Sequence, residues 1–347
     1  MIIALAPYRP TRGGLLLSIF VAGTLGVLPL IVNDSYSLHF IWKIVFWATV
    51  AAAWNIAGGY AGQLSLGHAA FFGLGAYTST LLYLNGVSPW IGMFVGGAVA
   101  AGFALILGML TLRLQGPFFA LASIAFAEVL RIVVVNWRSL TGGAEGISLP
   151  FSPGLVNMMF TSRTAYVYIM LMVLLAAFLI TYVLERSWLG YSLAAMRENE
   201  EAAEALGVDT IWMKLVSIGL SAFVCAVAGT MYAHYILLIE PSTVLGIGFS
   251  IEIALMAIIG GLGTPLGPLL GAVLIVPLSE YLRAEFGGSL QGLYLLIYGA
   301  ILIIMVMFMP LGLMSVLREP RATVRRLSAA FGAGTRERRR QRSGSHA

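Results

Sequence analysis

Ten runs of mainly apolar residues divide this chain, and most of them approach the length of a membrane-spanning helix. A helix needs about 20 apolar residues to cross the hydrocarbon core of a bilayer. The runs cover residues 15–32, 38–57, 69–84, 90–112, 117–135, 164–184, 215–239, 249–262, 266–283 and 290–314. Only 10% of the 347 residues are charged, whereas soluble domains carry roughly 25%, so the composition argues against a water-soluble enzyme. We therefore predict an all-α, polytopic integral membrane protein with about eight to ten transmembrane helices, some of them short or broken by glycine and proline.

The basic residues between these runs predict the orientation of the chain. With ten crossings and the N-terminus inside, one side of the membrane receives fifteen basic residues and the other receives three. The fifteen are Arg9, Arg12, Arg113, Arg186, Arg197, Lys214 and nine arginines of the C-terminal segment, and the three are Arg138, Arg163 and Arg283. Cytoplasmic segments are enriched in Lys and Arg, so both termini are expected to be cytoplasmic.

This arrangement divides the chain into three segments. Residues 1–37 are expected to form an N-terminal cytoplasmic segment and an uncleaved first span, and residues 38–315 the main transmembrane domain. Within that domain, residues 185–214 form the only sizeable cytoplasmic loop and residues 136–163 the only sizeable external loop. Residues 316–347 form an arginine-rich cytoplasmic tail that is predicted to be disordered.

The net charge of +5 comes from that tail. Residues 318–342 contain nine arginines and two glutamates, while the rest of the chain contains 11 basic and 13 acidic side chains. Because the rest of the chain is negatively charged, a nucleic-acid partner is not expected. A basic tail that follows a membrane span is instead expected to lie in the cytoplasm and to contact membrane lipid. One cysteine, Cys225, and four scattered histidines provide no metal-ligand spacing. No metal or cofactor site is therefore expected in this chain.

The 185–214 loop contains a short amphipathic pattern. At about 100° per residue, one helix face would carry Ala195, Ala202, Ala203 and Leu206, and the opposite face Arg197, Glu200, Glu201 and Glu204. Gly207 follows as a predicted C-terminal stop. The small apolar face suits docking into a groove of another protein better than insertion into lipid. A solvated connector helix is an equally supported alternative.

Two glycine-rich runs interrupt the predicted spans. The first, residues 54–77, includes Gly58, Gly59, Gly62, Gln63, Ser65, Gly67 and His68, and the second, residues 260–268, includes Gly260, Gly261 and Gly263. Paired interruptions in the two halves of a transporter indicate the translocation pathway. Close helix packing through small residues is the alternative, and for any single glycine it is the favoured one.

Several charged residues fall within or at the edge of the predicted spans, where charges are costly and usually face protein or water. They are Lys43, Glu128, Arg131, Glu252 and Glu280. Glu128 and Arg131 are three residues apart, so they can pair on one helix face. The pair is interpreted either as part of a polar pathway or as a structural ion pair. His68 and His234 are interpreted as packing residues rather than members of a proton relay.

Several motifs occur in a characteristic order along residues 38–315. They are the first glycine-rich run, residues 116–121, 126–131, 136–143 and 197–209, and the second glycine-rich run. In the loop, Glu201, Ala202, Ala203 and Gly207 form the pattern E-A-A-x-x-x-G. Together these motifs resemble branched-chain amino-acid ABC transporter permeases of the LivM type. Ile218 and Leu220 continue the loop motif, but Ser221 stands where the family has proline.

The resemblance implies a permease subunit of an ATP-driven importer in the bacterial inner membrane. Such an importer combines two related permeases, two ATPase subunits and an external solute-binding protein. Its substrates centre on leucine, isoleucine and valine, and relatives carry other amino acids, amides, urea or aromatic acids. The E-A-A loop of this family docks on the ATPase, which makes Arg197, Glu200, Glu201, Ala202, Ala203, Glu204 and Gly207 the expected coupling residues. ATP is expected on partner subunits, because this chain has no G-x-x-x-x-G-K-[ST] phosphate loop.

An ion-coupled secondary transporter is the alternative class. It would also contain broken helices and intramembrane charges, but it would transport without an ATPase and would not need the E-A-A loop. A membrane enzyme is disfavoured, because neither an H-E-x-x-H nor a G-x-S-x-G motif is present. The candidate pathway residues are the ten named above from the two glycine-rich runs, together with Glu128 and Arg131.

Overall fold

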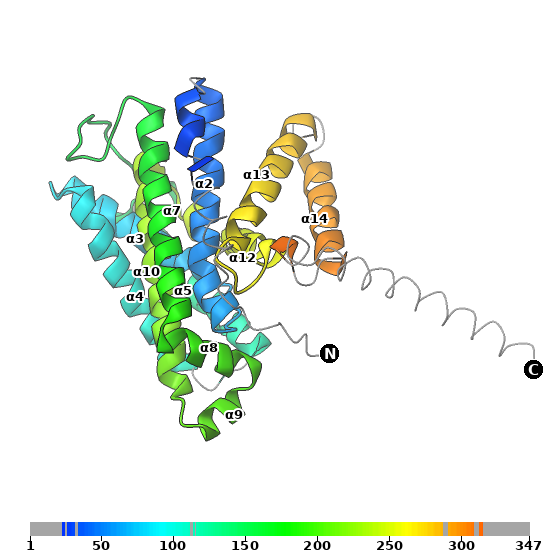
Figure 1. The fold of residues 1–347 in the computed structure, drawn as a ribbon. Helices are drawn as coiled ribbons and strands as arrows, with labels where there is room; N and C mark the ends of the chain where they lie inside the picture. Colours follow the sequence, from blue (N-terminus) through cyan, green and yellow to red (C-terminus); the bar gives the residue numbers. More distant parts are fainter. Residues whose placement is uncertain are drawn as a thin grey trace, which may run out of the picture.

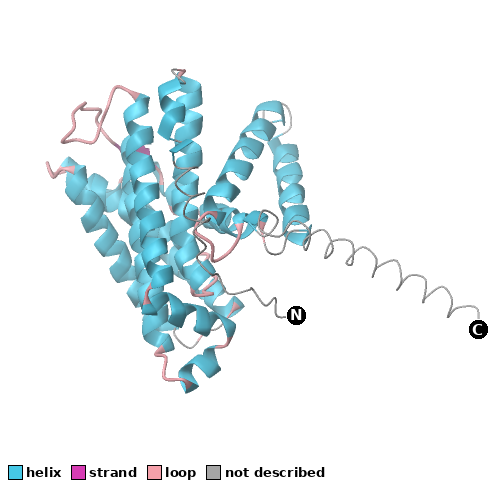
Figure 2. Cartoon of the chain, viewed as in Figure 1, coloured by secondary structure: helices cyan, strands magenta, loops and turns pink. Residues whose placement is uncertain are grey.

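The computed structural model describes residues 23–24, 26–31, 34–111, 114, 116–286, 291–308 and 312–314, most of which are helical. Within this part of the chain, six helices are long and apolar enough to cross a membrane. The cartoon in Figure 2 consists almost entirely of helices joined by loops. The prediction of an all-α polytopic membrane protein is confirmed. Residues 1–22, Arg113 and the 316–347 tail lie outside the described residues, so the segment boundaries at 37 and 315 stay predictions.

The helices follow the predicted apolar runs. In chain order the described elements are α2 (Ser35–Asn55), the π-helix η1 (Ile56–Tyr60), α3 (His68–Leu84), α4 (Pro89–Thr111), α5 (Pro117–Asn136), α6 (Arg138–Thr141), the 3₁₀-helix η2 (Gly143–Glu145), β1 (Ile147–Ser148), α7 (Arg163–Arg186), α8 (Trp188–Glu198), α9 (Glu200–Ala205), α10 (Thr210–Ile236), β2 (Leu238–Ile239), α11 (Pro241–Val244), α12 (Ile247–Gly260), α13 (Gly267–Phe286) and α14 (Gln291–Phe308). Each predicted run from residue 38 onward coincides with a helix. The two shortest predicted runs, residues 69–84 and 249–262, correspond to α3, with 17 residues, and α12, with 14.

Helix α2 lies at the centre of the bundle. It packs against α7, α10, α12 and α13, while α3, α4 and α10 pack on one another beside it (Figure 1). Its ring Phe46 contacts Phe72 of α3 and Phe249 of α12, with ring centroids 5.8 and 6.4 Å apart. Aromatic rings bury large apolar areas and prefer such tilted contacts, so this cluster locks three helices together.

Two interruptions make the chain turn inside the bundle. After Asn55, α2 continues as the π-helix η1, and residues 61–67 then lead back into α3. Between α12 and α13, the Thr264 hydroxyl donates to the Gly261 carbonyl oxygen at 2.8 Å and accepts from the Gly267 amide at 3.1 Å. Both interruptions coincide with the glycine-rich runs, so the prediction of glycine-broken helices is confirmed.

The 136–163 loop closes the end of the bundle opposite to α8 and α9 (Figure 1). It contains α6, η2 and β1, and β1 pairs antiparallel with β2 through Ile147 and Ile239. Met158 and Met159 of this loop are buried at 1% and 0% exposure, so the loop packs onto the bundle.

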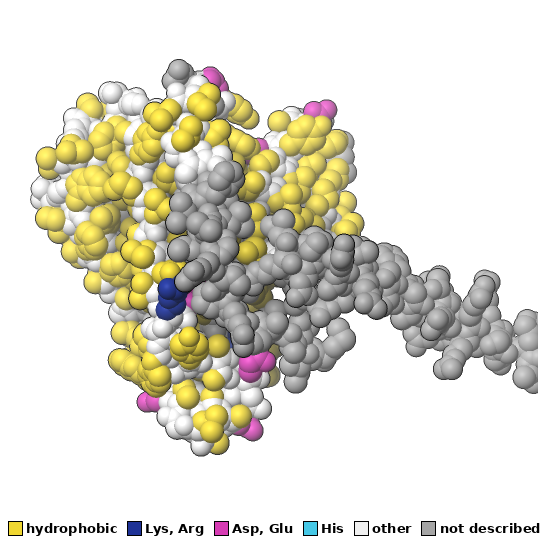
Figure 3. All heavy atoms as spheres, in the orientation of Figure 1, with side chains coloured by type: hydrophobic (Ala, Val, Ile, Leu, Met, Phe, Trp, Pro, Cys, Tyr) yellow, Lys and Arg dark blue, Asp and Glu magenta, His cyan; other side chains and the backbone are white. Residues whose placement is uncertain are grey.

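The surface of the bundle is suited to lipid. On the face in Figure 3, hydrophobic side chains cover the flanks, and acidic side chains gather mainly towards the two ends. Large apolar side chains such as Leu110, Phe118 and Leu179 are 75%, 66% and 62% exposed. Large contiguous apolar patches are uncommon on soluble monomers, whereas a bilayer accommodates them.

Candidate functional site

The two glycine-rich runs meet where η1 contacts the α12–α13 turn. The Asn55 side chain joins them, because its Nδ2 donates to the Thr264 carbonyl oxygen at 3.0 Å and its Oδ1 accepts from the Gly263 amide at 2.9 Å. Asn55 is only 1% exposed, so losing either bond would leave a buried polar group unpaired. We call Asn55, Gly59, Gly263 and Thr264 the glycine junction.

The two backbones approach closely in the glycine junction. A Cβ atom on Gly59 would lie 1.9 Å from Asn55 Oδ1 and 2.5 Å from the Gly263 nitrogen. Gly263 has a φ of +64°, and a Cβ there would lie 3.0 Å from the Gly59 carbonyl oxygen. Neither position has room for a side chain, which is why glycine is required at both. The role of these residues in translocation stays a prediction.

The remaining polar residues of the first run are held by α10. The Ser217 hydroxyl lies 3.2 Å from Gln63 Oε1, to which it donates. The His68 ring is fully buried, with Nε2 2.7 Å from the Ser221 hydroxyl oxygen and Nδ1 3.1 Å from the Ser65 hydroxyl oxygen. Both ring nitrogens therefore have partners, as expected for a packing histidine.

The Ser221 hydroxyl contacts both α2 and the His68 ring. The Ser221 hydroxyl donates to the Ala53 carbonyl oxygen at 2.6 Å, so its oxygen is an acceptor toward the ring. His68 Nε2 then carries the proton, and Nδ1 accepts from Ser65. The serine thus ties α10 to both α2 and α3.

The 185–214 loop forms two helices instead of the single amphipathic helix predicted from the sequence. α8 ends at Glu198, Asn199 has extended backbone with φ −158° and ψ 109°, and α9 begins at Glu200. The Asn199 side chain accepts from the Ala202 amide at 3.0 Å, which is an N-cap hydrogen bond. The prediction of one continuous helix is wrong, because this cap starts a new helix with a different direction.

The predicted apolar face of the loop is therefore divided. Ala203 is buried at 2% exposure, whereas Leu206 is 84% exposed and Ala195 and Ala202 are also exposed. Gly207 does end α9 as predicted, with a φ of +88°. The Val208 amide donates to the Ala203 carbonyl oxygen at 3.0 Å, and the Gly207 amide to that of Glu204 at 2.9 Å, which is a Schellman motif.

Arg197 points into the bundle and does not share a face with the three glutamates, so this prediction is also wrong. Its Nη1 donates to the Gly59 carbonyl oxygen at 2.7 Å. Burial lowers the pKa of the Arg197 guanidinium from its ordinary value, and Glu198 and Tyr60 act in the opposite direction. Because arginine titrates far above neutral pH, the group stays charged. A positive charge is therefore held beside the glycine junction.

The three glutamates of the loop have different environments. Glu200 forms an ion pair with Lys214 of α10, and Glu204 accepts from the Thr210 hydroxyl at 2.5 Å. Glu201 is exposed on the outer side of α9. The loop thus presents Glu201, Ala202 and Leu206 outward, and it uses Glu200 and Ala203 to hold α9 on the bundle.

A second contact ties the start of the loop to η1. The Tyr60 hydroxyl donates to Glu185 Oε1 at 2.7 Å, and the Glu185 side chain is at the end of α7. The π-helix is therefore held by α7 through Tyr60 and by α8 through Gly59.

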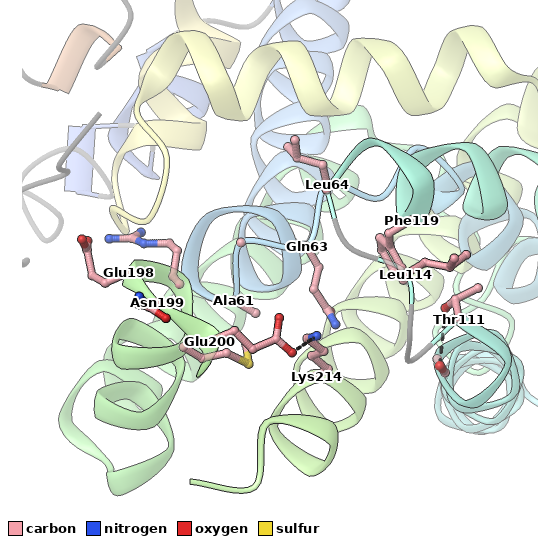
Figure 4. Close-up of a pocket in the computed structure, with 15 residues that line it drawn as sticks. Ala61, Gln63, Leu64, Thr111, Leu114, Phe119, Glu198, Asn199, Glu200 and Lys214 are labelled. Carbon is pink, nitrogen blue, oxygen red and sulfur yellow. Dashed lines mark hydrogen bonds and ion pairs between the residues drawn. The ribbon is translucent and has the colours of Figure 1, made fainter. Parts of the chain in front are cut away.

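A cavity of about 240 Å³ lies between the loop and the bundle. Its lining includes Gln63, Thr111, Phe119, Arg197, Asn199 and Lys214. In Figure 4 the Glu200 and Lys214 side chains point toward one another, with Gln63 close to them. The inward side of the loop therefore borders a partly polar space as well as packed residues.

Four of the five charged residues predicted in the spans form two ion pairs. On α5, Arg131 Nη2 lies 2.5 Å from Glu128 Oε1 and Nε donates to Oε2 at 2.9 Å, so the predicted pair is formed. On the other side, Lys43 of α2 pairs with Glu280 of α13. Whether the Glu128–Arg131 pair lines a pathway or fixes packing is not decided by this geometry, and both interpretations stay predictions.

The structure brings together Gly59, Gly263 and Arg197, which the sequence analysis assigned to two separate sites. It also adds residues that the sequence analysis did not identify, namely Asn55, Tyr60, Glu185 and Thr264. Asn55 had the clearest signal, since an amide at the end of a long apolar run needs a buried partner.

Comparison with known proteins gives a consistent result. The model of the family described as branched-chain amino acid transport system / permease component matches residues 36–306. The high-affinity branched-chain amino acid transport system permease protein LivM of Escherichia coli is 30% identical over 290 residues, which cover 76% of this chain and 66% of that protein. The chain thus spans just under two thirds of the length of that relative. The corresponding LivH protein of the same organism is 23% identical over 288 residues, or 77% of this chain and 91% of that protein.

One further relative is named for the transport of a different class of substrate. The nucleoside ABC transporter permease protein NupC of Lactococcus lactis is 24% identical over 250 residues, which cover 67% of this chain and 76% of that protein. No solved structure matches the chain. Because the family model covers most of the sequence, including both glycine-rich runs and the 185–214 loop, this chain belongs to the family of branched-chain amino acid transport system permease components.

Proposed function

We propose that this chain is a permease subunit of an ATP-driven importer that moves branched-chain or similar amino acids across a bacterial inner membrane. The observation that carries the proposal is the construction of the 185–214 loop. It presents Glu201, Ala202 and Leu206 outward on a short helix, while Arg197 reaches the glycine junction inside the bundle. An exposed helix with a buried connection to the spans suits a subunit that receives mechanical work from a partner.

The proposed partners are a second related permease, two ATPase subunits and an external solute-binding protein. Similarity to both LivM and LivH supports pairing of two permeases, since the names of those proteins assign both to high-affinity branched-chain amino acid transport. ATP is proposed to bind the ATPase subunits, because this sequence contains no phosphate-binding loop. The chain itself is then a transport subunit rather than an enzyme.

The proposed translocation pathway runs beside the two glycine-rich runs. The residues assigned to it are Gly58, Gly59, Gly62, Gln63, Ser65, Gly67, His68, Glu128, Arg131, Gly260, Gly261 and Gly263. Supporting this assignment, the runs interrupt helices inside the bundle, where irregular backbone is tolerated if it is buried in protein or lines a water-filled cavity. The paired charges Lys43 and Glu280, each with a side chain about one quarter exposed (25%), add a polar face on α2 and α13.

The proposed substrate class rests on family membership. Amino acids are favoured because LivM and LivH carry branched-chain amino acid transport in their names. Similarity to the nucleoside permease NupC supports a second candidate class, nucleosides. Amides, urea and aromatic acids stay alternatives from the sequence motifs. A ligand screen on the cognate solute-binding protein, read as thermal stabilisation, separates these classes.

The proposed orientation places the 185–214 loop and both termini in the cytoplasm. Glu201 belongs to α9, and Glu145 belongs to the 136–163 loop at the opposite end of the bundle. Single cysteines at these two positions, in a Cys225→Ala background, are to be treated with a membrane-impermeant thiol reagent on intact cells. We expect labelling at 145 and none at 201. Labelling at 201 alone would reverse the orientation.

The test of the function is uptake by proteoliposomes that contain the complete importer. With the solute-binding protein outside and ATP on the ATPase side, we expect uptake of leucine, isoleucine or valine only when ATP is hydrolysed. An otherwise identical sample with an inactive ATPase is the control. Uptake by this chain without any ATPase, driven by an ion gradient, would replace the proposal with a secondary transporter.

A further inference from the structure

The side chain of Arg197 connects the 185–214 loop to both glycine-rich runs at once. It leaves the last turn of α8 and donates from Nη1 to the Gly59 carbonyl oxygen at 2.7 Å. The same nitrogen lies next to the second run, since a Cβ atom on Gly263 would be 2.4 Å from it.

On the side away from the cavity, this side chain packs against both runs. A Cβ atom on Gly62 would lie 3.1 Å from Arg197 Cγ, so the first run encloses the aliphatic part of the side chain as Gly263 encloses its tip. Close-packed groups transmit displacement, because a gap must open or a contact must be compressed before one of them moves alone. A shift of α8 by a fraction of an ångström therefore reaches Gly59 and Gly263 directly.

The acceptor at the far end lies in an irregular helix. Gly59 is part of the π-helix η1, and such segments are frequent at functional positions because their hydrogen bonding differs from that of an α-helix. The Tyr60 hydroxyl of the same segment is bonded to Glu185 at 2.7 Å. The C-terminal end of η1 is thus held at two adjacent residues, Gly59 by Arg197 of α8 and Tyr60 by Glu185 of α7.

The donor set of Arg197 is incompletely used. Among the described residues, its Nε is buried and has no hydrogen-bond partner. Arginine has five donors in a rigid fork, which allows it to exchange partners while Nη1 stays in contact.

We propose that Arg197 is a positioning residue that transmits movement of the 185–214 loop to the glycine junction. This inference rests on the proposed function, since it assumes that a partner ATPase moves the loop. It assigns different roles to two parts of the loop. The exposed side of α9 binds the partner, and Arg197 transmits the displacement to η1 and the α12–α13 turn.

The test compares two substitutions in the reconstituted importer. Arg197→Gln removes the charge and the fork, whereas Arg197→Lys keeps the charge and one donor. The readouts are co-purification of the ATPase subunits, the rate of ATP hydrolysis, and the number of substrate molecules taken up per ATP. Arg186→Gln is the matched control, because Arg186 is an exposed arginine that lies over the Tyr182 ring at the end of α7.

We expect Arg197→Gln to keep its ATPase subunits and to hydrolyse ATP, while uptake per ATP falls by about tenfold, the size of one lost charge-assisted hydrogen bond. Arg197→Lys should recover uptake to within about threefold of the unmodified importer, because one donor remains. Arg186→Gln should keep the uptake per ATP of the unmodified importer. A merely structural role would lower hydrolysis and uptake together and leave their ratio unchanged.

Three results would overturn the proposal. An unchanged ratio in Arg197→Gln would show that the contact transmits nothing. Loss of the ATPase subunits from both variants would assign Arg197 to docking or folding. An equal loss of uptake per ATP in Arg197→Lys and Arg197→Gln would show that the charged donor to the Gly59 carbonyl oxygen does not transmit the movement. Failure of the unmodified importer to use ATP would instead reject the proposed function, so the two failures are distinguishable.

Discussion

The inner and outer sides of the 185–214 loop differ in nearly every physical respect, although they are only a few residues apart. On the inner side, Ala203 is 2% exposed and Arg197 is bonded to a backbone carbonyl oxygen of η1. On the outer side, Leu206 is 84% exposed and the Glu201 side chain is exposed as well. The inner side is therefore part of the bundle, while the outer side is available to another protein. The same short sequence motif thus contains residues of two different roles.

Substitutions that fill the glycine junction should have the largest effect, because the inner side depends on it. In Gly59→Leu, the new side chain would collide with the Asn55 amide and the Gly263 backbone. Overpacking of this kind destabilises by about 1–3 kcal/mol, and for a chain of this length we expect the melting temperature in detergent to fall by roughly 1–4 °C. Gly102→Leu is the control, since a Cβ at Gly102 in α4 has nothing within 4 Å.

Equal melting temperatures for Gly59→Leu and Gly102→Leu would contradict the distinction between the inner and outer sides of the loop. In that case the close approach of the two glycine-rich runs would not be needed for the fold, and the inner side of the loop would have no fixed surface to contact.

Tryptophan substitutions at two neighbouring alanines should have different effects on the buried and the exposed side of α9. Ala203→Trp places an indole at a position that is 2% exposed, so it should destabilise the permease by about 1–3 kcal/mol. Ala202→Trp places the same indole on the exposed side and should leave thermal stability unchanged while reducing co-purification of the ATPase. Thermal unfolding and co-purification, measured on both variants, check the pair. Identical behaviour of the two variants would mean that α9 has no distinct sides.

Neutralising single glutamates should have the smallest effects. Glu200→Gln removes the ion pair with Lys214, whose side chain is only 12% exposed, and we expect a loss of up to about 1 kcal/mol in stability. Glu204→Gln keeps an oxygen that accepts from Thr210, so its effect should be within a few tenths of a kcal/mol. Denaturant or thermal unfolding of the purified chain measures both. A larger effect for Glu204→Gln than for Glu200→Gln contradicts the assignment of these side chains.

The sequence was sufficient for the features that depend on local composition. Hydropathy predicted the helices, Gly207 predicted the end of α9, and the three-residue spacing of Glu128 and Arg131 predicted their pair. These features are set by residues within about one helical turn, or by the apolar content of a single segment. They do not require knowledge of which segments meet in space.

The sequence was insufficient where a single residue or a distant partner decides the outcome. The side chain of Asn199 caps a new helix, so the helical wheel that assumed one continuous helix placed Arg197 on the wrong side. The contacts of Asn55 with Gly263 and of Tyr60 with Glu185 join residues that are 208 and 125 positions apart. Nothing in the local pattern around either partner specifies the other one.

The most direct test of the account is a cross-linking measurement on the assembled importer. A cysteine at Glu201, on the exposed side of α9, is introduced in a Cys225→Ala background, and Glu145→Cys at the opposite end is the control. With a short bifunctional thiol reagent and engineered cysteines on the ATPase surface, the account predicts a cross-link from position 201 to the ATPase and none from position 145. An ATPase that co-purifies and drives uptake, yet never cross-links to position 201, would contradict the claim that the outer side of this loop receives the partner.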